Sequence, residues 1–434
     1  MSRNRIVTLF AMIMLAAPAG CGTSATPRRA ERPRMKVTPV ALPLHRPDRA
    51  DRTALPGVVQ ANNAFALDLY HRLRSEPGNL LISPACLTAG LGLLRAGARG
   101  ETAAEFDRVL HRTVTLPDRA LAALIQDLDA DGEDRAFQIR LANAVWVPRN
   151  YALLDDYRAA LRNVFAIHDD RQVDFDGHPA EAARIINAWI SERTGGKITG
   201  VIPPQSVTTP TKLVLTSALY FRGSWTEGFY RPETRDEPFH VTRTRSVTVP
   251  MMHQHSYTKV HDYLDGGSFL VVSLSCGQGA FAMDVLLPKE VDGLGALEAT
   301  LTPEMLAALW PKLKRSDDID ISLPRFRAQS SRALEPVLKE LGLSRAFVRE
   351  RADFSGINGK PADLYATAVT HETFVDVNEE GIEAAAFTRV ISPDAFGIDP
   401  PPVIRADHPF LYLLRDTRSG CIVFLGRVVE PGHQ

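Results

Sequence analysis

Apolar residues recur with two different spacings along the chain beyond residue 58. A spacing of three and four residues predicts helices, whereas alternation or a short apolar run predicts strands. We expect helices at 58–73, 84–96, 101–112, 118–129, 152–164, 179–194, 302–312 and 331–341. We expect strands at 137–147, 211–221, 246–260, 268–275, 280–287, 318–326, 366–378, 408–415 and 420–427. The two kinds of element are mixed without a regular strand–helix–strand alternation, which favours an α+β fold.

The pattern before residue 58 is different. A basic start is followed by the apolar segment 6–17, which is too short to span a bilayer and is typical of an export signal over 1–20. The small residues that end at Cys21 resemble a bacterial lipoprotein processing site, although a leucine is usual where Pro18 stands. We therefore expect export, with a lipidated Cys21 that attaches the chain to a membrane. Ordinary secretion is the alternative.

Residues 21–57 are rich in proline and arginine and show no apolar periodicity. This composition predicts an extended tether, and its excess of arginine offers contact with an anionic surface as a second interpretation. We find no second linker and no repeat, so residues 58–434 are expected to form a single domain.

Composition excludes several classes of protein. The chain has 434 residues, of which 45% are hydrophobic, and 50 basic side chains balance 51 acidic ones. That apolar content excludes disorder of the whole chain, and the balanced charge gives nucleic acid no basic surface to bind. Four scattered cysteines (Cys21, Cys86, Cys276 and Cys421) form neither a disulfide framework nor a zinc motif.

Catalytic motifs are missing from the sequence. We find no G-x-S-x-G, P-loop, H-E-x-x-H or dinucleotide-binding pattern, which argues against an enzyme. His253, His255 and His261 fall in a segment with strand character, where alternation would put all three on one face. A solvated strand face is the favoured interpretation and a metal site is the alternative.

The most informative segment is 378–388, which follows one expected strand and precedes a long connection to the next. Its residues are small and apolar, and with period two Ile382, Ala384, Ala386 and Thr388 form a face without charge. A long loop between two strands of a compact domain is usually functional. This one has the pattern of a strand that could enter a sheet. An alanine-rich helical turn after Gly381 is the alternative.

At this point the sequence resembles the serpin family over essentially the whole domain. The segments that carry the resemblance are 79–84, 97–102, 142–146, 215–225, 353–357, 379–381, 408–410 and 424–427. The resemblance implies three β-sheets with eight or nine helices and an exposed reactive-centre loop. It also implies a function: a serine protease attacks the loop, forms a covalent acyl-enzyme, and is trapped when the cleaved loop enters the large sheet.

Site residues follow from the same resemblance. The hinge would comprise Glu379, Glu380, Gly381, Ile382, Glu383, Ala384, Ala385, Ala386, Phe387 and Thr388. Counting from Gly381 as the family does, the reactive bond joins Ala395 and Phe396, and the neighbouring bonds at Asp394 and Gly397 remain open. Alanine there suits elastase-like or subtilisin-like proteases, and Phe396 suits a chymotrypsin-like one. We expect a monomer without a cofactor.

The sequence also departs from the family pattern. Ile382 is bulkier than the usual first inserted residue, although an apolar side chain can be buried there. Ser83 and His371 match a polar network beneath the insertion point, but Cys86 replaces a serine and Ser217 an asparagine. Cys86 is the weaker hydrogen-bonding group. Trp225 matches the residue at the top of the opening sheet. The alternative function is a serpin-fold protein that binds or acts as a chaperone without inhibiting.

Overall fold

A computed structural model describes residues 49–113, 118–128, 136–149, 151–165, 167, 171–203, 207, 211–254, 260–316, 319–382 and 402–432. The chain divides into two compact units at residue 43, and all of the described residues belong to the second unit. The predicted export signal, Cys21 and most of the predicted tether lie outside the described residues.

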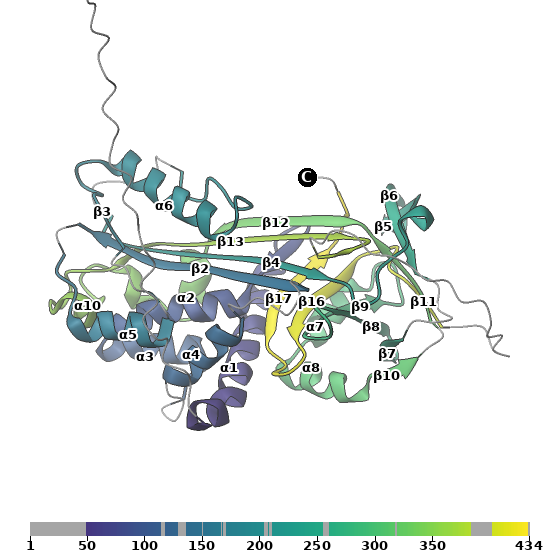
Figure 1. The fold of residues 1–434 in the computed structure, drawn as a ribbon, viewed down its shortest axis with the longest axis horizontal. Coiled ribbons are helices and arrows are strands. Elements are labelled where there is room, and N and C mark those ends of the chain that lie inside the picture. The colour runs from purple at the N-terminus through teal and green to yellow at the C-terminus, as the bar shows by residue number, and fades with distance from the viewer. Residues whose placement is uncertain are drawn as a thin grey trace, which may run out of the picture. The chain divides into compact units, whose positions relative to one another are not determined.

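A long six-stranded sheet dominates this unit (Figure 1). Its strands are, in spatial order, β12 (Phe326–Ala333), β13 (Ala366–Asn378), β14 (Gly381–Ile382), β4 (Leu213–Ser224), β2 (Phe137–Pro148) and β3 (Gln172–Val173). β13 and β4 run parallel and pair directly from Ala366 opposite Leu213 to Phe374 opposite Tyr220. The short β14 lies between them only at one end, where it is antiparallel to both.

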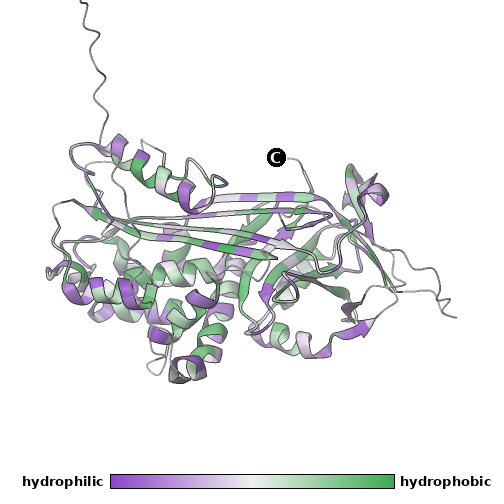
Figure 2. Ribbon diagram, in the orientation of Figure 1, coloured by the Kyte–Doolittle hydropathy of each residue, from purple (hydrophilic) through white to green (hydrophobic). Residues whose placement is uncertain are grey.

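Two further sheets complete the β structure. The seven-stranded sheet has the order β1 (Leu80–Ile82), β17 (Ile422–Val428), β16 (Phe410–Asp416), β9 (Phe281–Pro288), β8 (Phe269–Cys276), β7 (His261–Asp265) and β10 (Lys314–Ser316). The four-stranded sheet has the order β15 (Val403–Arg405), β11 (Asp320–Pro324), β6 (Arg245–Gln254) and β5 (Arg235–Thr242). In Figure 2 hydrophobic residues fill the strands at the centre of the seven-stranded sheet, where every residue of β16 and β17 is buried.

Ten α-helices occur among the described residues. They are α1 (Arg49–Leu73), α2 (Pro84–Gly97), α3 (Gly100–Val109), α4 (Asp118–Leu128), α5 (Asp155–Phe165), α6 (Pro179–Arg193), α7 (Leu294–Thr300), α8 (Pro303–Leu309), α9 (Glu335–Glu340) and α10 (Ser355–Asn358). Figure 1 shows α6 on one face of the six-stranded sheet and α2 to α5 on the other. Ile186 and Ile190 of α6 pack with Ala218 of β4, so this sheet is covered on both faces.

The fold class is confirmed, whereas several predicted boundaries are wrong. α1 begins at Arg49, so the boundary that we placed at residue 57 falls inside a helix; Val58 and Val59 are buried in the core there. The predicted helix at 331–341 is in fact the end of β12 followed by the short α9. The expected strand 246–260 ends at Gln254, and the next strand, β7, belongs to another sheet. β5 and the short helices α7 and α10 were not predicted.

Within the part of the chain that the structure describes, no helix is long and apolar enough to cross a membrane. Cys86, Cys276 and Cys421 are free and buried. Burial raises the pKa of the Cys276 and Cys421 thiols well above the usual range, so both are protonated packing residues.

Candidate functional site: a parallel seam in the large sheet

The hinge enters the six-stranded sheet at the open end of the seam between β13 and β4. Gly381 lies opposite Asn378 of β13 and Ser224 of β4, and Ile382 lies opposite Val377 and Gly223. Ile382 is 2% exposed and packs in the same core cluster as Val377. The first inserted position is therefore already occupied, and its bulky apolar side chain is buried on the inner face.

Trp225 holds the turn that leads from β13 into β14. Its indole Nε1 donates to the carbonyl oxygen of Asn378 at 2.8 Å, and its backbone N–H donates to the carbonyl of Glu380 at 3.0 Å. The indole is 3% exposed and packs edge-on against Phe229. Trp225 thus contributes both core packing and two hydrogen bonds to the turn that leads into β14.

Glu379 is the buried anchor of the same turn. Its carboxylate accepts a hydrogen bond from the Thr234 hydroxyl at 2.8 Å and pairs with the Arg325 guanidinium at 3.4 Å. The backbone carbonyl of Glu379 accepts from the N–H of Phe229 at 2.9 Å. A carboxylate that is only 3% exposed needs such partners, because an unpaired buried charge is strongly destabilising. Arg325 and Thr234 were not predicted, because both are distant from Glu379 along the chain.

A polar cluster lies beneath the seam on its inner face. The ring of His371 on β13 accepts a hydrogen bond at Nε2 from the Ser83 N–H at 2.9 Å, so the neutral ring carries its proton on Nδ1 and donates to the Ser217 carbonyl at 3.2 Å. Burial lowers the pKa of His371 to about 3, which keeps the ring neutral. The Ser83 hydroxyl donates to the Val423 carbonyl and also caps α2 through the Cys86 N–H.

Cys86 is the centre of the second half of this cluster. The Ser217 hydroxyl donates to the Cys86 sulfur at 3.2 Å, and the thiol donates to Asn143 Oδ1 at 3.3 Å. Asn143 Nδ2 returns a hydrogen bond to the Cys86 carbonyl at 3.0 Å. Gly90 of α2 permits this close approach, because a Cβ there would lie 3.3 Å from Asn143 Oδ1. The four predicted residues Ser83, Cys86, Ser217 and His371 do lie together, and Asn143 is the member that we missed.

Glu372 lies on the opposite face of β13 from His371, as alternation requires. It is opposite Ala218, which packs against α6, and it accepts a hydrogen bond from the Ser331 hydroxyl of β12. The residue is 3% exposed, and burial raises the pKa of its carboxyl to about 7 despite that hydrogen bond. The outer face of the seam thus carries a buried acid that is held partly protonated near neutral pH.

The other predicted loop positions lie outside the described residues: Glu383, Ala384, Ala385, Ala386, Phe387, Thr388, Asp394, Ala395, Phe396 and Gly397. The chain is described again from residue 402, where β15 pairs in parallel with β11 at the edge of the four-stranded sheet. The structure therefore fixes both ends between which residues 383–401 run.

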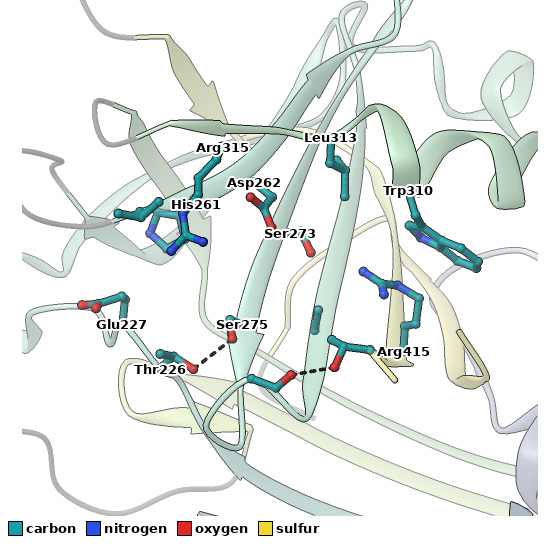
Figure 3. Close-up of a pocket in the computed structure, with 14 residues that line it drawn as sticks. Thr226, Glu227, His261, Asp262, Ser273, Ser275, Trp310, Leu313, Arg315 and Arg415 are labelled. Carbon is teal, nitrogen blue, oxygen red and sulfur yellow. Dashed lines mark hydrogen bonds between the residues drawn. The ribbon is translucent and has the colours of Figure 1, made fainter. Parts of the chain in front are cut away.

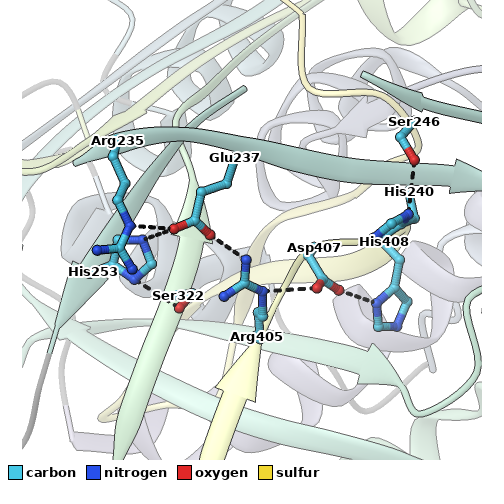
Figure 4. A network of polar contacts seen from close by, with 9 residues as sticks. All are labelled: Arg235, Glu237, His240, Ser246, His253, Ser322, Arg405, Asp407 and His408. Carbon is cyan, nitrogen blue, oxygen red and sulfur yellow. Dashed lines mark hydrogen bonds and ion pairs between the residues drawn. The ribbon is translucent and has the colours of Figure 1, made fainter. Parts of the chain in front are cut away.

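An ion-pair network fixes β15 to its sheet (Figure 4). The Arg405 guanidinium pairs with Glu237 of β5 and with Asp407 at 3.0 Å. Burial opposes the ionisation of Asp407, but hydrogen bonding from His408 and the charge of Arg405 outweigh it and lower the pKa of that carboxyl. Charge-assisted contacts of this kind are stronger than neutral hydrogen bonds, so the C-terminal end of the loop is firmly attached.

The interpretation of the three histidines as one strand face is wrong. His253 belongs to the four-stranded sheet, where its ring contacts Glu237 at 3.0 Å and Ser322 at 3.1 Å, and it is 3% exposed. His261 begins β7 in the seven-stranded sheet and is 4% exposed. His255 lies outside the described residues. Two of these side chains are therefore buried in different sheets and do not share a solvated face.

The described geometry defines a protein with a parallel seam in its large sheet and a hinge seated at one end of that seam. The chain belongs to the serpin family. Residues 60–431 match the family model described as Serpin (serine protease inhibitor). The family assignment supports protease inhibition as the general activity.

Relatives and solved structures agree with this assignment. The chain is 35% identical to an uncharacterized serpin-like protein of Thermococcus kodakarensis over 383 residues, which cover 86% of each chain. It is 35% identical to the leukocyte elastase inhibitor of Bos taurus over 379 residues, which cover 86% of this chain and 98% of the relative. Among solved structures, Serpin48 of Tenebrio molitor superposes with a TM-score of 0.76 at 28% identity, covering 88% of this chain and 99% of that chain. Maspin gives a TM-score of 0.79 at 26% identity, covering 87% of this chain and 100% of maspin.

Proposed function

We propose that the protein inhibits serine proteases as a suicide substrate whose cleaved loop inserts between β13 and β4. The observation that carries this proposal is the position of β14. It is already paired with both strands at one end of a seam whose remaining length is closed only by direct β13–β4 pairing. A new antiparallel strand can continue from β14 if that pairing opens.

The strand register of β14 is compatible with insertion of the loop between β13 and β4. Extended from Ile382 opposite Val377 and Gly223, the same register brings Thr388 between His371 and Ser217, which are now opposite one another. Phe387 would then lie between Glu372 and Ala218 on the outer face beneath α6. The uncharged residues of the hinge would thus face the polar cluster and the core, as the sequence pattern requires.

The chemical step would be performed by the protease. Its serine oxygen attacks the carbonyl of Ala395, the amine of Phe396 leaves, and an ester joins the two proteins. Insertion of about fourteen residues at roughly 3.3 Å each would carry the ester tens of ångströms from its starting point. Hydrolysis of the ester requires the close alignment of a catalytic triad and an oxyanion hole, so distortion of the tethered protease would block its release.

Elastase-like, subtilisin-like and chymotrypsin-like proteases are the proposed targets. Ala395 suits the small pockets of the first two and Phe396 suits the third. The identity with the bovine leukocyte elastase inhibitor supports an elastase-like target in particular.

The test is incubation of the full chain with elastase, subtilisin or chymotrypsin, followed by denaturing electrophoresis and mass spectrometry. We expect a band at the summed mass that survives denaturation, with a released fragment that begins at Phe396. A fragment that begins at Ala395 or Gly397 would move the bond by one residue. Complete loop cleavage without a covalent complex would refute inhibition by trapping and favour the binding function.

We also propose that the protein is exported and attached to a membrane through lipidated Cys21. The basic start, the apolar segment 6–17 and the small residues before Cys21 support this proposal. Expression of the full chain in a bacterium, with metabolic lipid labelling, tests it. The wild type should carry the label in the membrane fraction and the Cys21→Ser variant should not. Equal labelling of both, or label in neither, would contradict the proposal.

A further inference from the structure

A cavity of about 550 Å³ lies on the seven-stranded sheet (Figure 3). Ser273, Ser275 and Ala282 of β8 and β9 form one side, and Trp310 and Leu313, which follow α8, form another. The volume is within the range of small-molecule sites. Nothing in the proposed inhibitory mechanism uses it.

A buried cluster fixes one cation in the wall of this cavity. The carboxylate of Asp284, which is fully buried, accepts hydrogen bonds from Ser273 at 2.5 Å, Trp310 Nε1 at 2.9 Å and Arg415 Nε at 2.9 Å. The Arg415 guanidinium also lies 4.9 Å from the centre of the Trp310 ring. The guanidinium is therefore held in one orientation before any ligand arrives.

The free edge of this guanidinium faces the cavity. Arg415 uses Nε and Nη2 for Asp284, whereas its Nη1 makes no hydrogen bond with any residue that the structure describes. The residue is 9% exposed and lines the cavity (Figure 3). A buried guanidinium with unused donors is a strong partner for a carboxylate, because it offers a fixed, charge-assisted hydrogen bond.

The rest of the lining restricts which anion fits. Arg315 also lines the cavity, and its side chain forms no hydrogen bond or ion pair with a described residue. Two acids, Glu227 and Asp262, line it as well, and Asp262 is opposite Arg315 in the β7–β10 ladder. These acids disfavour a ligand of high negative charge such as phosphate. The indole of Trp310 and the side chain of Leu313 offer an apolar wall.

We propose that this cavity binds a small organic carboxylate that carries an aromatic or apolar group. The carboxylate contacts the free edge of Arg415, and the apolar group packs against Trp310 and Leu313. No residue of the hinge or of the predicted reactive bond belongs to the described lining, so neither proposal depends on the other.

The test uses 2-naphthoate, its neutral isostere 2-naphthamide, and inorganic phosphate, each titrated into the full-length protein by calorimetry. We expect saturable binding of one 2-naphthoate per chain, at least tenfold weaker binding of 2-naphthamide, and no binding of phosphate. Equal affinity for the acid and the amide, or preferential binding of phosphate, would overturn the proposal.

Substitutions in the lining test whether 2-naphthoate binds in this cavity. Arg415→Lys keeps the charge but replaces the planar guanidinium with a single ammonium group. It should weaken the binding of 2-naphthoate at least tenfold. Because that change touches the buried ion pair, a second variant, Ser275→Glu, places a carboxylate at a half-buried position of the lining. It should abolish binding with an unchanged melting temperature, whereas exposed Arg108→Gln on α3 should bind as the wild type does. Wild-type affinity in Ser275→Glu would place 2-naphthoate elsewhere and refute the site.

Discussion

His371 and Glu372 are neighbours on β13 whose pKa values shift in opposite directions, to about 3 and about 7. Between pH 3 and 6.5 the unfolded chain binds a proton at His371 that the folded chain does not, so stability rises with pH. Between pH 4.5 and 7 the folded chain binds a proton at Glu372 that the unfolded chain has lost, so stability falls with pH. The two effects oppose one another where the ranges overlap.

We predict that Glu372→Gln removes the contribution of Glu372 to the pH dependence of stability and leaves that of His371. Relative to the wild type, the variant should gain stability as pH rises from 4.5 to 7, by at most about 1.4 kcal/mol per pH unit. Denaturant unfolding across this range measures the difference. Glu340→Gln, at an exposed position of α9, is the control and should stay parallel to the wild type. A constant difference between Glu372→Gln and the wild type would contradict the assigned pKa.

Ser83 is a second residue whose removal should be costly. Its fully buried hydroxyl donates to the Val423 carbonyl at 2.8 Å and accepts from the Cys86 N–H that begins α2. Ser83→Ala leaves both backbone groups unsatisfied, and we expect a loss of about 1–3 kcal/mol in unfolding free energy. Chemical denaturation checks this, with exposed Ser75→Ala as the control. A loss below about 0.5 kcal/mol would show that water replaces the hydroxyl.

Sequence reasoning located part of this site at the residue scale. Ser83, Cys86, Ser217 and His371 were grouped from the family resemblance, and the structure places them in contact. Asn143 was missed, although a polar residue in the apolar second half of an expected strand is a detectable signal. Arg325 and Thr234 were not detectable. Residues of these types are common on protein surfaces, and the sequence does not indicate which buried acid they contact.

At the scale of elements, β14 is the strand that the described part of the hinge forms, and Glu379 in the preceding turn is the contact that secures it. We predict that Glu379→Gln weakens its pairing with Arg325 and increases hydrogen exchange at the amides of 377–382 at least tenfold. Glu380→Gln changes the adjacent acid, whose side chain forms no hydrogen bond or ion pair with a described residue, and should leave exchange unchanged. Equal protection in both variants would show that Trp225 alone holds the turn.

Predicted element boundaries were wrong where the local sequence pattern and the tertiary pairing disagree. Residues 331–333 fit a helical pattern, but their pairing with 370–372 of β13 extends β12 through them. α1 begins nine residues before its predicted start, although Pro56 lies inside it, because Ala54 and Leu55 of the added turns pack against the core. A two-residue strand such as β14 has no periodicity of its own and can be recognised only from its partners.

At the scale of the whole molecule, the three-sheet fold was predictable because many motifs of the family occur in order. The parallel contact between β13 and β4 was not predictable, since residues 221–365 separate their paired segments along the chain. This order bears on the proposed function, because β14 already lies between β13 and β4 at one end, and an antiparallel strand could continue from it. Insertion would convert one parallel contact into two antiparallel ones, and antiparallel pairing is slightly the more stable per residue.

A matched pair of substitutions can therefore test whether the loop enters the seam between β13 and β4. In the proposed inserted register, Thr388 faces His371 in the interior and Phe387 faces outward opposite Glu372. Thr388→Arg would bury an unpaired charge next to a neutral histidine, at a cost of several kcal/mol, whereas Phe387→Arg would meet the Glu372 carboxylate. We predict that cleaved Phe387→Arg melts at least 10 °C above its intact form, as cleaved wild type should. Cleaved Thr388→Arg should melt like its intact form and release active protease. Calorimetry of each cleaved chain decides the matter, because a stabilised Thr388→Arg would show that the loop enters the sheet in another register or does not enter it at all.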